Sequence, residues 1–406
     1  MLERYQLSNG LRIVEERIEH VRSVTIGIWI LSGTRNESTE ENGMAHLIEH
    51  MLFKGTNRRT AKQIAEAFDR IGGHVNAFTS KEYTCFYAKV MDEHVEEALD
   101  LLSDMVLHSS IDKDELEREK DVIFEEIAMT EDTPDDVIHD YLQETSYQGH
   151  PLGQSILGTR DSLSSLSRED VIKFKERFFT GERIVLSVAG QVPDQFHKLV
   201  EKYFSELSTG DAKQDSLSHT FNHRKLELTE DISQAHVCLG FDGYPIGDQT
   251  MYPLTILNNV LGGAMSSRLF QQVREDRGLA YDIFSYHNPF RDNGILTIYS
   301  ATSYERLDDV EAIMFDIISD IRQNGIKEQE RLDTIQQLKG QLVLGLEHTS
   351  SRMQRNGRNE LLNEPHMPVD DVITNLESVT HQDIQSVAKD LFSKEPARAW
   401  IVPKSI

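Results

Sequence analysis

One succession of expected elements occurs twice in this chain. In each half, an apolar strand leads to two helices, then to two further strands and a third helix. The ranges are 23–33, 43–55, 60–73, 74–80, 83–90 and 95–107 in the first half, and 235–243, 251–263, 267–278, 280–287, 295–302 and 310–321 in the second. Landmarks keep a similar offset, since Gly55 and Gly263 are 208 residues apart and Ser103 and Ser319 are 216 residues apart. The repetition predicts an internal duplication.

The duplicated pattern also predicts the fold class. Strands and helices alternate without the steady rhythm of a parallel sheet, which favours an α+β fold in which each domain is a mainly antiparallel sheet packed with helices. With 406 residues, the chain is long enough for two such domains. The polar stretch 207–222 is rich in Ser, Thr, Asp and Gly and is typical of a linker. We therefore expect domains at 1–210 and 223–406, joined by a linker at 211–222.

Charge, hydropathy and cysteine usage restrict the partners and the location. A formal net charge of −26 disfavours nucleic acid and anionic membrane as partners. No apolar run approaches the roughly 20 residues of a membrane span, and the N-terminal segment has no apolar core of a signal peptide. The two cysteines, Cys85 and Cys238, are far apart in sequence, which fits a reducing cytoplasm and not a disulfide framework. We expect a cytoplasmic protein in which any metal is held by histidine and carboxylate side chains.

Two histidines and a glutamate interrupt the apolar segment 44–52. On a helix, His46 and His50 are four residues apart and point the same way, and Glu49 lies about 60° from His46. Two imidazoles in this arrangement can hold a metal ion with a carboxylate beside them. The alternative is a pair of core histidines and a solvated glutamate.

The duplication provides a control for this cluster. At an offset of 208 residues, the equivalent positions are Leu254, Leu257 and Asn258. The fold position therefore does not itself require histidine, which favours a functional reason for the residues in the first half.

A catalytic zinc ion needs about three protein ligands and one open position. The expected helix at 111–129 offers many carboxylates, and its apolar stripe helps to choose among them. The stripe consists of Leu116, Ile123 and Ile127. Glu119 and Glu126 lie on the flank of the stripe, within roughly 60–100° of it, whereas Glu125 projects nearly opposite. We predict Glu126 as the ligand and Glu119 as a carboxylate that orients a histidine. By pattern alone, two exposed helix charges are an equal alternative.

These residues carry a resemblance to a known family. The run His46-x-x-Glu49-His50 is the inverted zinc-peptidase motif, and the chain resembles the pitrilysin and insulin-degrading superfamily, most closely the mitochondrial processing peptidase β-subunit branch. In that branch a glutamate ligand follows the second histidine by 76 residues, which is Glu126 here, and a further glutamate seven residues earlier matches Glu119. The likeness continues in order through "HLIEHMLFKGT", "GGHVNAFTSKEYTCFYAKV", "DYLQETSYQGHPLGQSILGT" and "SSRLFQQVREDRGLAY".

The resemblance implies a zinc endopeptidase that cleaves extended peptides or unfolded segments. One Zn²⁺ per chain would be held by His46, His50 and Glu126, and Glu49 would be the general base. The matching strand residues Asn76 and Ala77 imply that substrate is held by edge pairing.

Two further pairs of residues follow from the same resemblance. Arg274 and Tyr281 match a pair that binds the substrate carbonyl oxygen and supports the tetrahedral intermediate. Asp136 and Asp140 match two acids that read arginine near the cut, although the first is Asp where the family has Glu. We therefore expect a preference for basic residues near the cut, read at position 136 by a side chain that is shorter than the Glu of the family.

Long relatives join two halves that close like a clamshell, and this chain has the length of one half. It carries both the zinc-site residues and the Arg/Tyr pair, which implies a homodimer in which Arg274 and Tyr281 of one chain complete the zinc site of the other. The rival interpretation is a non-catalytic peptide-binding or structural core-type subunit of the same fold. Such subunits have typically lost motif residues that are all present here.

Overall fold

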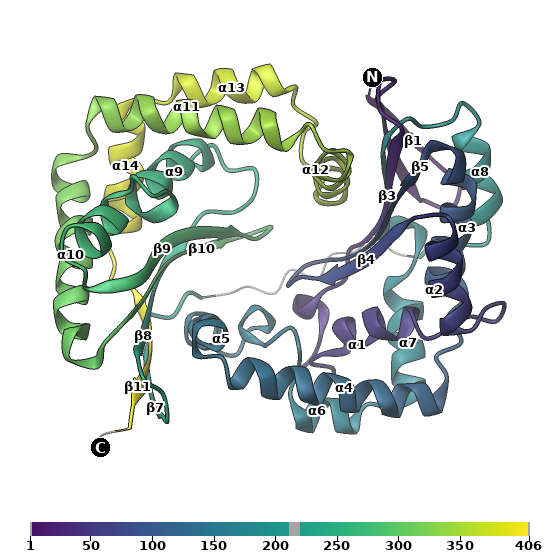
Figure 1. Ribbon diagram of the computed structural model, residues 1–406, viewed down its shortest axis with the longest axis horizontal. Helices are drawn as coiled ribbons and strands as arrows, with labels where there is room; N and C mark the ends of the chain where they lie inside the picture. The colour runs from purple at the N-terminus through teal and green to yellow at the C-terminus, as the bar shows by residue number, and fades with distance from the viewer. Residues whose placement is uncertain (1, 211–219, 405–406) are drawn as a thin grey trace. The chain divides into compact units, whose positions relative to one another are not determined.

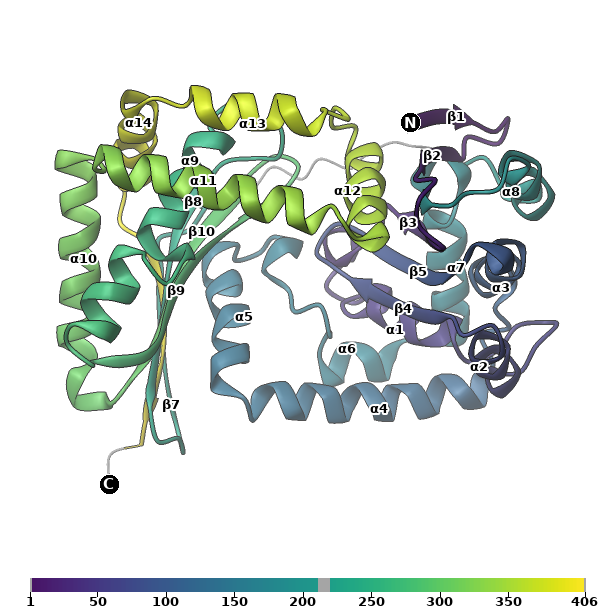
Figure 2. The same cartoon turned by 45° about the horizontal axis from the view of Figure 1, so that its top comes forward.

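The computed structural model describes residues 2–210 and 220–404. The predicted linker at 211–222 lies mostly outside them, because 211–219 are not among the described residues. The described residues form one six-stranded and one five-stranded sheet with helices packed on both, as Figures 1 and 2 show. The predicted α+β fold class is confirmed.

The first sheet has the strand order β1-β2-β6-β3-β5-β4. Its strands are β1 (Leu2–Gln6), β2 (Arg12–Arg17), β3 (Ser23–Ile30), β4 (His74–Thr79), β5 (Thr84–Met91) and β6 (Ile184–Gly190). Only β2 and β6 pair in parallel; the other neighbours are antiparallel. The central strands β3 and β6 are buried almost throughout, which explains why they have continuous apolar runs and no polar alternation.

The second sheet repeats this topology without the outermost strand. Its order is β7-β11-β8-β10-β9. The strands are β7 (Lys225–Glu230), β8 (Ala235–Gly243), β9 (Ala280–Pro289), β10 (Gly294–Thr302) and β11 (Ala397–Pro403). Here β7 and β11 are the parallel pair, and β8 is antiparallel to both of its neighbours, as β3 is in the first sheet. The shared topology confirms the predicted duplication.

The helices follow the predicted order in both repeats. In the first they are α1 (Met44–Leu52), α2 (Ala61–Arg70), α3 (Val95–His108), α4 (Lys113–Glu131), α5 (Pro134–Ser146), α6 (Arg160–Ser165), α7 (Arg168–Phe178) and α8 (Phe196–Phe204). In the second they are α9 (Met251–Asn258), α10 (Leu307–Asn324), α11 (Glu328–Gly345), α12 (Thr349–Leu362), α13 (Val369–Ser378) and α14 (His381–Leu391). No helix of the described residues is long and apolar enough to cross a membrane.

Shorter helical turns complete the description. The 3₁₀ turns are η1 (Thr34–Asn36), η2 (Asp92–His94), η3 (Pro151–Gly153), η4 (Gly181–Arg183) and η7 (Tyr304–Arg306). Two segments expected to be α-helical contain π-helix: α9 continues into η5 (Asn259–Gly263), and the segment at 267–278 contains η6 (Phe270–Glu275).

The chain divides into two compact units that exchange two helices. Unit 1 contains 1–128, 154–217 and 345–366, and unit 2 contains 129–153, 218–344 and 367–406. The predicted domains 1–210 and 223–406 miss this exchange, because a helical pattern does not reveal which sheet the helix will cover. Helix α5, from the first repeat, packs on β8 and β11 of unit 2, and α12, from the second repeat, packs on β3 and β6 of unit 1.

Helix α12 approaches the first sheet closely enough that two glycines are required. A Cβ added at Gly357 would lie 2.2 Å from Trp29 Nε1, and one added at Gly27 would lie 2.3 Å from Met353 Sδ. The Trp29 indole N–H points at the same sulfur, at 3.3 Å. The absence of side chains at both glycines lets the helix backbone settle against the strand.

Candidate metal centre

Helix α1 separates its side chains into a buried apolar face and a polar face. Five side chains are at most 1% exposed: Met44, Leu47, Ile48, Met51 and Leu52. Their packing fixes the rotation of the helix about its axis, so that His46, Glu49 and His50 all lie on the other face. Helix α4 lies alongside α1 (Figure 2).

The three predicted ligands come together in unit 1. Glu126 Oε2 lies 3.7 Å from His46 Nε2 and 3.7 Å from His50 Nε2. The donor atoms of the three residues all lie within 4.8 Å of one another. Two imidazole nitrogens and one carboxylate oxygen are the three protein donors typical of a catalytic zinc site. The residues therefore fit zinc, and the alternative of unrelated core histidines does not explain their convergence.

The glutamates of α4 differ in burial, as predicted. Glu126 is half-buried beside the histidines, whereas Glu125 is exposed. Glu119 is only 4% exposed. Its Oε2 lies 3.1 Å from His50 Nδ1, and its Oε1 pairs with Lys54 Nζ at 2.6 Å. A carboxylate on Nδ1 fixes the tautomer that leaves Nε2 free to bind metal.

The two histidines differ in what holds their rings. Within the described residues, His46 Nδ1 is buried and has no hydrogen-bond partner, unlike His50 Nδ1. Burial, followed by the charge of His50, lowers the pKa of His46 to about 4. His46 is therefore neutral at pH 7, the state that a metal ligand requires.

The side chain of Glu49, a residue of α1, contacts the end of β4. The Thr79 hydroxyl donates a hydrogen bond of 2.5 Å to Glu49 Oε2. Burial raises the pKa of Glu49, and the Thr79 hydrogen bond and the His50 charge oppose that rise. Sequence patterns did not single out Thr79 or Lys54, although the two residues lie within the blocks "GGHVNAFTSKEYTCFYAKV" and "HLIEHMLFKGT".

Strand β4 is one of the two edge strands of the first sheet and contains Asn76 and Ala77. Asn76 is exposed, and its Oδ1 accepts a hydrogen bond from its neighbour's backbone, Ala77 N, at 2.8 Å. β5 is the only strand of the described residues that pairs with β4. Since β4 also contacts α1, an unpaired edge lies close to the predicted ligands.

The remaining predicted residues belong to unit 2. The Arg274 guanidinium lies 4.6 Å from the centre of the Tyr281 ring, so these two residues form a stacked pair. Tyr281 is 71% exposed. Asp136 is exposed and Asp140 half-buried, one turn apart on α5.

Comparison with known proteins identifies the family. The family model for insulinase, peptidase family M16, matches residues 12–160, and the model for the peptidase M16 inactive domain matches 165–338. A Bacillus subtilis protein named "Uncharacterized zinc protease YmxG" is 47% identical over 99% of this chain and 98% of its own length. The chain belongs to peptidase family M16.

A second relative is similar over nearly the whole chain, and a solved structure shares the fold. A Streptomyces coelicolor protein named as an uncharacterized zinc protease is 38% identical over 99% of this chain and 90% of its own length. The crystal structure of a protease from Helicobacter pylori has a TM-score of 0.93 at 21% identity, covering 100% of this chain and 99% of that chain. The inactive-domain model matches the repeat in which Leu254, Leu257 and Asn258 replace the metal-binding motif.

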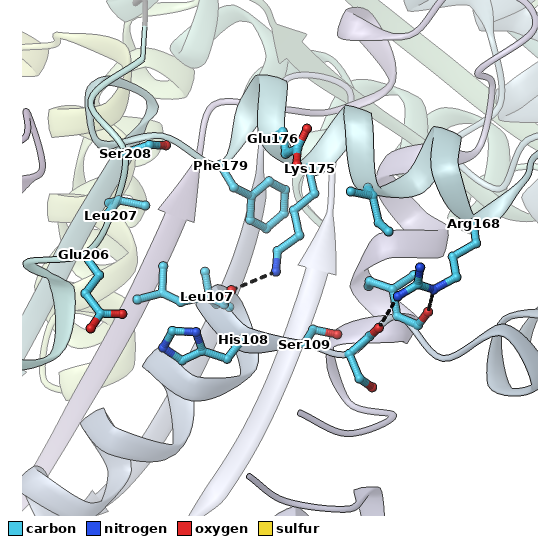
Figure 3. Close-up of a pocket in the computed structure, with 14 residues that line it drawn as sticks. Leu107, His108, Ser109, Arg168, Lys175, Glu176, Phe179, Glu206, Leu207 and Ser208 are labelled. Carbon is cyan, nitrogen blue, oxygen red and sulfur yellow. Dashed lines mark hydrogen bonds between the residues drawn. The ribbon is translucent and has the colours of Figure 1, made fainter. Parts of the chain in front are cut away.

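A cavity of about 470 Å³ in this M16 chain contains none of the predicted site residues (Figure 3). It lies between the end of α3, α7 and the segment 206–208. Lys175 Nζ donates to Leu107 O at 3.3 Å, and Arg168 Nη2 donates to Ser110 O at 3.0 Å. Burial lowers the pKa of Lys175 to about 8. Lys175 thus satisfies a carbonyl group in the last turn of α3, and Arg168 satisfies one in the loop that follows, which are structural roles.

The assignment of Glu126 as a metal ligand can be tested by replacing it and its neighbour Glu125 separately with Gln. Glu126→Gln should lower zinc affinity by more than the roughly 10–100-fold that loss of an outer-sphere partner costs, because it removes a ligand. Glu125→Gln makes the same chemical change on an exposed position and should leave the affinity unchanged. Elemental analysis and chelator competition measure both. Metal loss in Glu125→Gln with retention in Glu126→Gln would refute the assignment.

Proposed function

We propose that this chain is a zinc-dependent endopeptidase that cleaves extended peptides or unfolded segments. The observation that carries the proposal is the convergence of His46, His50 and Glu126 beside the carboxylate of Glu49. The family membership and the relatives named as zinc proteases support it.

Each side chain of the site has a separate role in the proposed reaction. A bound zinc ion supplies Lewis acidity, which lowers the pKa of a water ligand and polarises a carbonyl group. Glu49 takes a proton from the attacking water and returns one to the departing amine. The Thr79 hydroxyl on Glu49 Oε2 fixes the orientation of that carboxylate. Glu119 keeps His50 in the metal-binding tautomer.

The edge of β4 suits an extended substrate. A peptide that pairs with Asn76 and Ala77 would add a strand to the first sheet through main-chain hydrogen bonds. Such binding tolerates many side chains, and it requires substrate that is unfolded over several residues. This explains the proposed preference for peptides and unfolded segments.

The role of Glu49 predicts a separation of binding from catalysis. Glu49→Gln should retain zinc and peptide binding, while turnover of a quenched peptide should fall by about 10²–10⁴-fold, the usual contribution of a general base. Glu66→Gln on α2 is a suitable control, because Glu66 is exposed and its one ion pair among the described residues is with Lys62. A Glu49→Gln protein that keeps a tenth of the wild-type rate would exclude the proposed role.

We further propose a preference for arginine in substrates, read by Asp136 and Asp140. Their one-turn spacing on α5 supports the proposal, because two carboxylates at that spacing can share one guanidinium. Replacing both with Asn should remove most of an arginine preference in a cleavage-site profile obtained by mass spectrometry. Replacing Asp132 and Asp135 with Asn is the charge-matched control. An unchanged preference in the first variant would place the recognition elsewhere.

We also propose a homodimer in which Arg274 and Tyr281 of one chain act at the zinc site of the other. Each chain carries one set of zinc-site residues and one Arg/Tyr pair, which supports a two-fold arrangement with two complete sites. In such an arrangement, a substitution in the zinc-site residues of one chain, or in the Arg/Tyr pair of its partner, inactivates the site that these residues form together.

Mixing two inactive variants tests the arrangement. Glu49→Gln and Arg274→Ala/Tyr281→Phe should each be inactive alone. After subunit exchange, half of the dimers are mixed and each has one intact site, so about a quarter of wild-type activity should return. If the residues act within one chain, no intact site forms and the mixture stays inactive. A mass-labelled chain verifies the exchange.

A further inference from the structure

The start of helix α1 cannot be capped by its own N-cap residue. That residue is Gly43, which has no side chain and adopts a left-handed conformation with φ 90°. A Cβ at Gly43 would lie 2.8 Å from Leu157 O and 2.9 Å from Gly158 Cα, so the usual Ser, Thr or Asp cap does not fit. The free N–H groups of the first turn therefore need an acceptor from elsewhere.

Glu37 supplies that acceptor from the loop after η1. Its Oε2 accepts from Gly43 N at 2.8 Å, and its Oε1 accepts from Ala45 N at 2.7 Å. Asn42 Nδ2 donates to Oε2 at 3.2 Å. The side chain is only 2% exposed. This burial raises the pKa of Glu37 to about 7, although the hydrogen bonds from the amides of Ala45 and Gly43 act to lower it.

The position of this cap matters because of how His46 is held. His50 is oriented directly by Glu119, whereas His46 Nδ1 has no partner among the described residues. Only packing and the backbone of α1 therefore fix the direction of the His46 ring. The amide of Ala45, which Glu37 binds, immediately precedes His46.

We propose that Glu37 is a positioning residue of the metal centre, which fixes the start of α1 and thereby aims His46 at the metal. This inference rests on the proposed zinc site. It assigns the two histidines different supports: a side-chain carboxylate on the ring of His50, and a buried carboxylate on the backbone before His46.

Glu37→Gln tests the inference with little change of shape. One acceptor oxygen becomes an NH₂ group that faces a backbone N–H, so one of the two cap bonds is lost. The zinc dissociation constant, measured by chelator competition well below the melting temperature, should rise by about 10–100-fold, the range for loss of an outer-sphere partner. The visible absorption bands of the cobalt-substituted protein should also change, because the His46 ligand is displaced.

Glu41→Gln is the matched control. Glu41 lies in the same loop, but its side chain bonds Ser38 N and Arg177 and makes no contact with the α1 amides. This variant makes the same chemical change, Glu to Gln, and should keep the wild-type dissociation constant and cobalt spectrum. A lower melting temperature for Glu37→Gln with unchanged zinc affinity and spectrum would show a merely structural role and overturn the inference.

Two further outcomes are informative. If Glu37→Gln does not fold, Asn42→Ala removes one hydrogen bond to Glu37 and should raise the dissociation constant in the same direction by a smaller factor; no change in that variant would overturn the inference. If the wild-type protein itself binds no zinc, the proposed function fails, and the role of Glu37 fails with it. Zinc binding by wild type and Glu37→Gln with equal affinity would overturn only the role of Glu37.

Discussion

The metal centre depends on the rotation of one short helix about its own axis. Helix α1 is nine residues long and buries six of them, Met44, Ala45, Leu47, Ile48, Met51 and Leu52. A helix this short has little stability of its own, so tertiary packing decides where it lies. Because the apolar face fits the core in one rotation, the polar face must point at α4, and both histidines then reach Glu126. Core packing and metal binding are thus two consequences of the same spacing.

The duplicated repeat shows what the same position does without a metal. In unit 2, α9 occupies the place of α1, with Leu254 and Leu257 buried where His46 and Glu49 stand in unit 1. Regular α-helix is kept from Leu254 to Asn258, the positions equivalent to His46 and His50, and the π-helical turn η5 begins only after them. The second repeat therefore retains the backbone of the motif without its ligands.

The sequence predicted the elements that carry strong local patterns and missed those that depend on distant partners. The spacing of His46 and His50 and the flank of α4 were sufficient to select Glu126 over Glu125, because helical geometry converts spacing into direction. Strands β1, β2, β6, β7 and β11 were not predicted. The pairings of β2 with β6 and of β7 with β11 join segments far apart in the chain, which local patterns do not reveal. Thr79 and Glu37 were missed for a similar reason. Glu37 reaches the α1 amides across a loop, and Thr79 reaches Glu49 from a different element, with α2 between them in the chain. Periodicity within one element predicts neither contact.

The exchange of α5 and α12 has a consequence for how the protein is made. All six strands of the first sheet are complete once β6 ends at Gly190, but the helix that covers Trp29 begins only at Thr349. During synthesis on the ribosome, the unit that contains the metal centre therefore waits for most of the second repeat before its sheet is covered. A chain that stops early leaves that face open to chaperones and proteases. The metal-binding unit reaches its finished form only in molecules whose translation has passed residue 362.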